Sequence, residues 1–114
     1  MKISLLHPSR SRPEKAKTTA RKWIEQAGVP VEHIFSVDNS DPRGHEYFEE
    51  GFTTLQYPNE SAVDAINRAA AVSTGDILIV VSDDTDCPRN WGRKIIEETH
   101  GQTDWILKVN DGIQ

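Results

Sequence analysis

The sequence predicts an α/β fold: a three-layer α/β/α arrangement with an open, mostly parallel sheet between two layers of helices. Strand-like and helix-like hydrophobic patterns alternate along the chain, which is typical of parallel strands joined by helices. Residues 77–81 form an apolar run rich in β-branched side chains, as in a strand buried on both faces. The chain has 114 residues, the usual size of one domain, and we expect a single domain over residues 1–114.

The first half of the chain is predicted to contain three strands. Residues 3–6 are a short apolar strand. The segment Ser11-Arg12-Pro13-Glu14 is a capping box that predicts the start of a helix with Pro in its first turn. Apolar residues recur at helical spacing up to Ala27, and Gly28 ends the helix. We then expect strands over 31–37 and 52–57, separated by a turn at 38–42 and by a short helix or loop over 43–51.

The second half is predicted to complete the sheet with two strands and two helices. One helix begins near Asn59 to Ser61 and ends at Gly75, and its buried side is expected to comprise Ala62, Ile66, Ala69 and Ser73 with Val63 and Ala70 beside them. After the strand at 77–81, a helix runs from Pro88 to Gly101 and a last strand covers 105–109. No helix follows that strand, so we expect part of a larger sheet, whose exposed edge is free to pair with a second copy.

Composition and charge exclude several function classes. The net charge of −5 disfavours binding to nucleic acid. Cys87 is the single cysteine, so no internal disulfide or cysteine-based zinc site is expected, which fits a cytoplasmic protein. No apolar run reaches the length of a membrane span or of a signal-peptide core. Basic residues gather between Arg10 and Lys22, and we interpret them as the solvated face of a helix.

Polar residues follow three of the predicted strands, at the edge where parallel sheets bind ligands. His7-Pro8-Ser9-Arg10 follows the first strand, Asp38-Asn39-Ser40 the second, and Ser82-Asp83-Asp84 the strand at 77–81. Carboxylates are hard oxygen ligands that suit Mg²⁺ or Mn²⁺ shared with a phosphate. The sequence therefore predicts a metal–phosphate site at these strand ends, with loop formation and helix capping as the alternative role of the acids.

This ordered set of motifs resembles the nucleotide-binding half of a GT-A fold glycosyltransferase of the inverting family 2 type. The matching features are the turn Pro8-Ser9-Arg10-Ser11, the strand end Asp38-Asn39-Ser40, Asn67 within a helix, Gly75-Asp76 before the buried strand, Ser82-Asp83-Asp84 after it, and then Pro88 and Trp91. The resemblance covers residues 2–110. Its specificity comes from the order and spacing of the motifs rather than from any one of them.

The resemblance implies a Rossmann-like half of a GT-A fold that binds a nucleotide-diphosphate sugar, a UDP-sugar first of all, for inverting glycosyl transfer. The implied nucleotide-binding residues are Pro8, Ser9, Arg10, Asp38, Asn67 and Asp83, with Asp38 accepting a hydrogen bond from a uracil-type imide. Asp84, together with Asp83, would ligate the Mn²⁺ or Mg²⁺ that bridges the two phosphates. The sugar acceptor is not implied.

The chain departs from the family pattern in two ways. Ser82 stands where the Asp-x-Asp motif of the family has its first Asp, and the frame Asp84-Thr85-Asp86 is an alternative two residues later. Family members also continue into an acceptor-binding half that supplies the catalytic base, so we expect a truncated or minimal form without that base. A non-catalytic nucleotide-binding module is the second hypothesis. A phosphoacceptor receiver is disfavoured, because its paired acids would follow the first strand, where this chain has His7-Pro8-Ser9.

The remaining reactive side chains are interpreted as structural. The four histidines, His7, His33, His45 and His100, lack metal-ligand spacing. His7 is near the proposed site, where a lone histidine is more often a hydrogen-bonded structural residue. Cys87 and the Trp residues are assigned to packing, and Asp86 to capping of the third helix.

Overall fold

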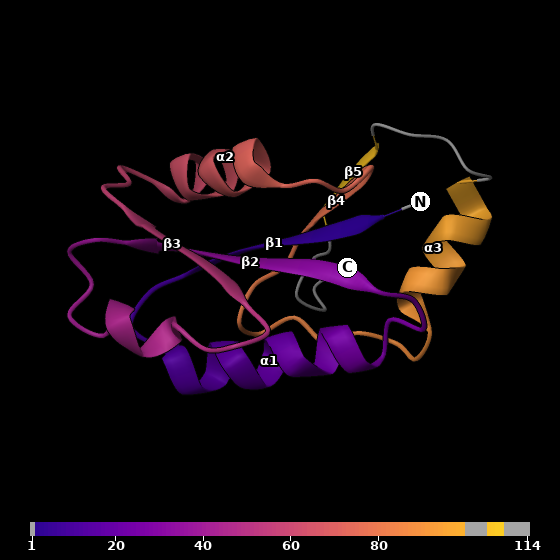
Figure 1. The fold of residues 1–114 in the computed structure, drawn as a ribbon, viewed down its shortest axis with the longest axis horizontal. Coiled ribbons are helices and arrows are strands. Elements are labelled where there is room, and N and C mark those ends of the chain that lie inside the picture. Colours follow the sequence, from indigo (N-terminus) through magenta and orange to yellow (C-terminus); the bar gives the residue numbers. More distant parts are fainter. Residues whose placement is uncertain (1, 100–104, 109–114) are drawn as a thin grey trace.

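Parallel strands form one open sheet in the computed structural model, which describes residues 2–99 and 105–108 (Figure 1). The five strands are β1 (Ile3–Ser9), β2 (Val31–Asp38), β3 (Thr53–Tyr57), β4 (Ile77–Val80) and β5 (Trp105–Lys108). Their order in the sheet is β3-β2-β1-β4-β5, and every neighbouring pair is parallel. The predicted α/β class with a parallel, open, Rossmann-like sheet is confirmed.

Helices cover both faces of the sheet, as predicted (Figure 1). The α-helices are α1 (Pro13–Glu25), α2 (Ala62–Val72) and α3 (Trp91–Thr99), and a short 3₁₀ helix, η1, covers Gly44–Tyr47. The helices α1 and α2 lie on opposite faces, because the chain moves from β1 to β3 in one direction and returns across the sheet to β4. The short helix η1 packs on the α1 face, between α1 and β2.

Two layers of apolar side chains hold the helices to the sheet. On the α1 face, Trp23 packs against Trp91 with ring centroids 4.9 Å apart, and Trp91 Nε1 donates to the Trp23 carbonyl at 2.7 Å. On the α2 face, Leu6 and Ile34 pack against Ala69. The prediction that tryptophans belong to the core is confirmed for Trp23 and Trp91. The side chain of Trp105 lies outside what the structure describes.

The first strand is longer than predicted and includes His7, Pro8 and Ser9. All three residues pair with β2 in a continuous parallel register. Pairing with β4 ends at Leu6, so Pro8 lies where β1 has a neighbour on one side only. A proline is tolerated there, because its missing N–H is not required on the unpaired side. The polar residues of this strand end are therefore held by the sheet rather than by a loop.

The capping box predicted at the start of the first helix is wrong. Ser11 adopts a left-handed conformation with φ of 57°, and its N–H and Oγ donate to Asp41 at 2.6 and 2.9 Å. Arg12 is the N-cap residue and makes no side-chain capping bond. The hydroxyl of Ser11 thus ties β1 to the turn after β2, and Pro13 favours the first helical turn, which the hydrogen bond from Ala16 N to the Arg12 carbonyl closes.

The other helices begin or bury their side chains differently from the prediction in two places. The start of α2 agrees with the prediction, and Ser61 is its N-cap, since it accepts from Asp64 N; however, Ala62 and Val63 are exposed while Ala65 and Ala69 are buried. The helix α3 begins at Trp91 rather than at Pro88, because Asn90 has a φ of 58° that no α-helix accommodates. Asp86 is therefore not its cap. The predicted ends at Gly101 and Val109 lie outside the described residues.

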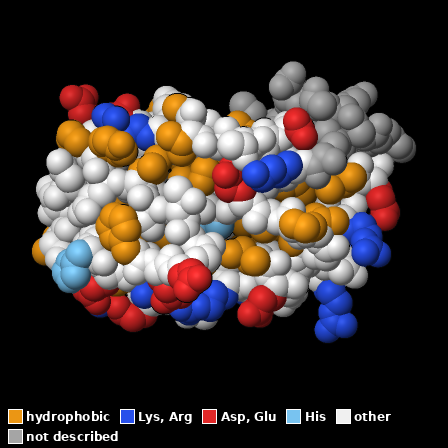
Figure 2. Space-filling view, in the orientation of Figure 1, with side chains coloured by type: hydrophobic (Ala, Val, Ile, Leu, Met, Phe, Trp, Pro, Cys, Tyr) orange, Lys and Arg blue, Asp and Glu red, His pale blue; other side chains and the backbone are white. Residues whose placement is uncertain are grey.

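The basic residues of α1 are exposed or, for Lys17, half-buried, and they pair with acids of neighbouring loops. Lys17 and Arg21 both contact Glu49, at 3.4 and 2.5 Å, and Lys22 contacts Asp86 at 2.5 Å. Figure 2 shows basic and acidic side chains interspersed along this edge of the molecule. Mixed charge of this kind offers no continuous basic surface. No helix within residues 2–99 is long and apolar enough to cross a membrane.

Gly75 lies where the chain enters β4, and β1 leaves no room there for a side chain. Its N–H donates to Ser4 Oγ at 2.9 Å, and a Cβ would lie 2.7 Å from the backbone nitrogen of Ser4. We predict that Gly75→Ala lowers the free energy of unfolding by about 1–3 kcal/mol, the usual cost of overpacking. Urea unfolding measures this loss. Val63→Ala is the control, since Val63 is exposed, and equal losses for the two variants would contradict the prediction.

Candidate functional site

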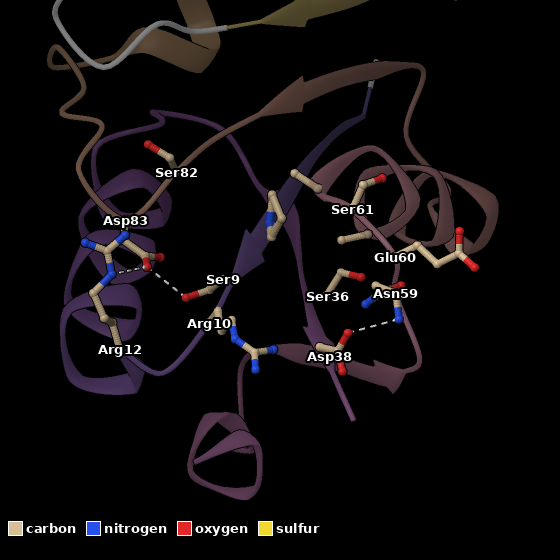
Figure 3. A pocket seen from close by; sticks show the side chains of 13 residues that line it. Ser9, Arg10, Arg12, Ser36, Asp38, Asn59, Glu60, Ser61, Ser82 and Asp83 are labelled. Atoms are coloured by element: carbon tan, nitrogen blue, oxygen red, sulfur yellow. Dashed lines mark hydrogen bonds and ion pairs between the residues drawn. The ribbon is translucent and has the colours of Figure 1, made fainter. Parts of the chain in front are cut away.

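A cleft of about 430 Å³ opens at the carboxyl ends of β1, β2 and β4, below the first turn of α2 (Figure 3). Polar residues from the ends of all three strands line it, and the loop before α2 closes one side. The lining residues are Pro8, Ser9, Arg10, Arg12, Ser36, Asp38, Asn59, Glu60, Ser61, Ala62, Ala65, Ser82 and Asp83. The strand ends selected from the sequence therefore meet in one place.

The cleft lies where the strand order reverses. The chain leaves β1 toward β2 on one side, whereas β4 joins β1 on the other side. The helices α1 and α2 cover opposite faces of the sheet (Figure 1), and residues at the start of both helices, among them Arg12 and Ser61, line the cleft. Open α/β sheets bind their ligands at such a switch point.

Asp38 ends β2 and organises one wall of the cleft. Its Oδ1 accepts from the N–H and Oγ of Ser40, both at 2.7 Å, and its Oδ2 accepts from the N–H of Asn59 at 3.1 Å. The hydrogen bond from the Ser40 hydroxyl, followed by those from the two backbone N–H groups, lowers the pKa of Asp38. An ionised carboxylate has about four acceptor positions, so Asp38 keeps one for a ligand N–H or O–H.

Asp83 is buried on the α1 face and is occupied by contacts within the protein. It is 3% exposed; its Oδ1 accepts from His7 Nε2 at 2.7 Å, and its Oδ2 accepts from Ser9 Oγ at 2.8 Å. Arg12 Nε lies 3.3 Å from the same Oδ2, and Thr19 Oγ1 donates to the Asp83 carbonyl at 2.7 Å. Asp83 therefore joins β1, α1 and the loop after β4, and its oxygens do not point freely into the cleft.

Two histidines extend this buried network under α1. His7 Nδ1 and His33 Nε2 share a hydrogen bond of 2.9 Å, and both side chains are buried. The structural role expected for His7 agrees with this position. The role of His33 was not predicted, although the sequence contains a signal for it. His33 pairs in register with Leu5 of the adjacent strand, and His7 stands two residues after Leu5, so both histidines occupy core-facing positions.

Asp84 points outward at the edge of the cleft. Its side chain is 45% exposed and pairs with Lys15 and, at 3.6 Å, with Arg12. The ion pair with Lys15 is the main reason that the pKa of Asp84 is lowered. Asp84 is absent from the cleft lining, and among the described residues no group of three His, Cys, Asp or Glu side chains is placed to hold a metal ion.

The other predicted nucleotide-binding residues divide between the cleft and the surface. Pro8, Ser9 and Arg10 line the cleft, and Arg10 donates a long hydrogen bond of 3.4 Å to Ser40 Oγ. Asn67 is exposed on α2 and is not part of the lining. Cys87 is buried in the core as predicted, and burial raises the pKa of its thiol to about 11.

Comparison with known protein families, curated proteins and solved structures found no match for this chain. The resemblance to family 2 glycosyltransferases therefore rests on the motifs in the sequence.

His33 links the stability of the network to pH. Burial, followed by the neighbouring His7, lowers the pKa of His33 well below its ordinary value of 6.5. The unfolded chain therefore takes up this proton at a higher pH than the folded chain. It follows that the stability from His33 is complete above about pH 6.5 and is lost as the pH falls below that value.

We predict that His33→Gln flattens the pH dependence of unfolding between about pH 6.5 and pH 5. On unfolding, the variant should take up as much as one proton fewer than the wild type. The slope of the unfolding free energy against pH should therefore fall by as much as about 1.4 kcal/mol per pH unit. Urea unfolding at a series of pH values measures this slope independently of the absolute stability of each variant. Parallel curves for the wild type and His33→Gln would contradict the prediction.

Proposed function

We propose that this domain binds a nucleoside diphosphate, as its sugar ester, in the cleft at the ends of β1, β2 and β4. One observation carries the proposal: polar residues from three strand ends line a single cleft at the switch point of a parallel sheet. The sequence motifs add the reaction class, namely donor binding for glycosyl transfer. A UDP-sugar donor and a cytoplasmic location belong to the same proposal.

Arg10 and Arg12 are the cationic groups available to the diphosphate. Both line the cleft, and the side chain of Arg12 is 53% exposed (Figure 3). The contact between Arg10 and Ser40 is weak, since this hydrogen bond is 3.4 Å long. Guanidinium groups form charge-assisted and often bidentate hydrogen bonds with phosphate. We therefore assign the phosphates to the open end of the cleft, where these two arginines lie.

The residues present fit a divalent ion in one mode only. Mg²⁺ in phosphate sites is usually held by one or two carboxylates together with the substrate phosphates. Asp84 suits this mode, because it is exposed and its pairing with Lys15 is a surface ion pair, which is weak. Asp83 does not suit it, because both of its oxygens are already bonded within the protein. Such an ion would neutralise negative charge on the diphosphate.

Isothermal calorimetry tests the proposal directly. We expect the wild-type chain to bind UDP and UDP-glucose in the presence of Mn²⁺, and uridine more weakly. Arg10→Gln should lower the affinity for UDP about tenfold, because a charge-assisted contact to phosphate is lost. Arg21→Gln is the matched control, since Arg21 pairs with Glu49 outside the cleft, and it should bind as the wild type does. Absence of binding for every nucleoside diphosphate would overturn the proposal.

A further inference from the structure

Two polar side chains of the cleft have no hydrogen-bond partner among residues 2–99 and 105–108. Ser36 is 2% exposed, and its Oγ makes no hydrogen bond. The two amide atoms of Asn59 are also buried and unpartnered. Both residues line the cleft beside Asp38 (Figure 3). A buried polar group without a partner costs stability, so each such group in a folded protein needs an explanation.

Packing does not explain why Ser36 and Asn59 are polar. Ser36 lies between Phe35 and Val37, whose side chains face the α1 side, so strand alternation directs its hydroxyl to the α2 side. There the neighbouring core is formed by apolar side chains such as Leu6 and Ile34. An alanine would fill the same place without an unpaired hydroxyl. The polar atoms are therefore suited to something that enters the cleft.

Asp38 completes a hydrogen-bonding wall with these two residues. It stands two residues after Ser36 on the same face of β2, and it binds the backbone N–H of Asn59 at 3.1 Å. The carboxylate can only accept, the hydroxyl can donate or accept, and the amide offers both kinds of atom. A ligand edge with an N–H next to an oxygen or nitrogen acceptor can satisfy all three.

We propose that Ser36 and Asn59 determine base specificity by hydrogen-bonding the polar edge of the nucleobase, which is uracil in the nucleotide we expect. This inference rests on the proposed function. Uracil carries a carbonyl on each side of its ring N–H, so a carbonyl faces the neighbours of Asp38 whichever way the ring lies. The base occupies the buried part of the cleft, below α2, and the phosphates extend outward to Arg10 and Arg12.

The test compares UDP with inorganic pyrophosphate, which has no base, on the wild type and on the double variant Ser36→Ala/Asn59→Ala. We expect the double variant to lose about tenfold or more in affinity for UDP, while pyrophosphate binds equally to both proteins. The affinities for UDP, CDP, ADP and GDP should also become more alike in the double variant. Both substitutions retain the hydrogen bond that the backbone N–H of residue 59 donates to Asp38.

Stability provides a second, independent readout. Because the removed groups have no partner in the part of the chain that the structure describes, the urea midpoint of the double variant should equal or exceed that of the wild type. Ser73→Ala is the control: its Oγ donates to the Ala70 carbonyl at 2.7 Å at the far end of α2. That control should lower the midpoint and leave UDP binding unchanged.

The outcomes separate this inference from the proposed function. If the wild type binds UDP and the double variant binds it equally well, base recognition by Ser36 and Asn59 is wrong, while nucleotide binding stands. A lower urea midpoint in the double variant would also overturn the inference, since the groups would then have a stabilising partner. If the wild type binds no nucleotide at all, the proposed function falls and this inference with it.

Discussion

Asp83→Ala is expected to lower the free energy of unfolding by about 3 kcal/mol, because it removes the acceptor at the centre of a buried network. Asp83 is 3% exposed and accepts from His7 at 2.7 Å and from Ser9 at 2.8 Å. Alanine would leave the donor on His7 buried without an acceptor. A loss of this size is a large part of the roughly 5–15 kcal/mol that stabilises a typical domain. Urea unfolding at neutral pH measures it.

The adjacent carboxylate provides the control for this prediction. Asp84 is exposed, and its contacts with Lys15 and Arg12 are surface ion pairs, which contribute little to stability. Asp84→Ala should therefore unfold at the urea concentration of the wild type. If the two alanine variants lose equal stability, the distinction between a buried and an exposed acid is wrong. Any loss of ligand binding in Asp83→Ala has to be interpreted together with the loss of stability of this variant.

The fold was predictable because its signals are repeated along the chain. The apolar run at 77–81 and the helical periodicity around Trp23 each indicate a type of element, and their alternation leaves few possible topologies. The cap at Ser61 was also predictable, since it depends on residues within one turn of helix. Local signals of this kind do not require knowledge of distant residues.

The errors arose where a distant residue decides the local structure. Ser11 stands in a sequence typical of a helix cap, but its hydroxyl and its N–H both donate to Asp41. The sequence does not distinguish the adjacent acids Asp83 and Asp84. In the structure Asp83 is buried, because its carboxylate accepts hydrogen bonds from His7 and Ser9. Tertiary contacts of this range have no counterpart in spacing or composition.

The candidate site was predictable at the level of strand ends but not of individual roles. Asp38 and Arg10 follow strands whose carboxyl ends converge, and both line the cleft. Ser36 was passed over because it lies inside a strand, although alternation places it on the same face as Asp38. Asn59 was passed over as part of a helix start, and nothing in the sequence distinguishes its buried amide from an exposed one.

Asp84→Asn should lower the affinity for UDP about tenfold or more in the presence of Mn²⁺, because the proposed metal–diphosphate contact loses a charged oxygen ligand. In EDTA the substitution should no longer lower the affinity for UDP. Asp84 now pairs with Lys15 and with Arg12, so its neutralisation frees positive charge beside the phosphates. Affinity without metal should therefore equal or exceed that of the wild type. Calorimetry of both proteins with and without Mn²⁺ measures the four values.

Asp86→Asn is the matched control for this prediction, and it also tests the alternative frame Asp84-Thr85-Asp86. Asp86 belongs to the same loop and is exposed, but it pairs with Lys22, whereas Asp84 contacts Arg12, which lines the cleft. We expect this variant to bind UDP with wild-type affinity under both conditions. Equal affinities of the wild type and Asp84→Asn with Mn²⁺ present would show that Asp84 binds no metal. A Mn²⁺-dependent loss in Asp86→Asn alone would assign the ion to the later carboxylate.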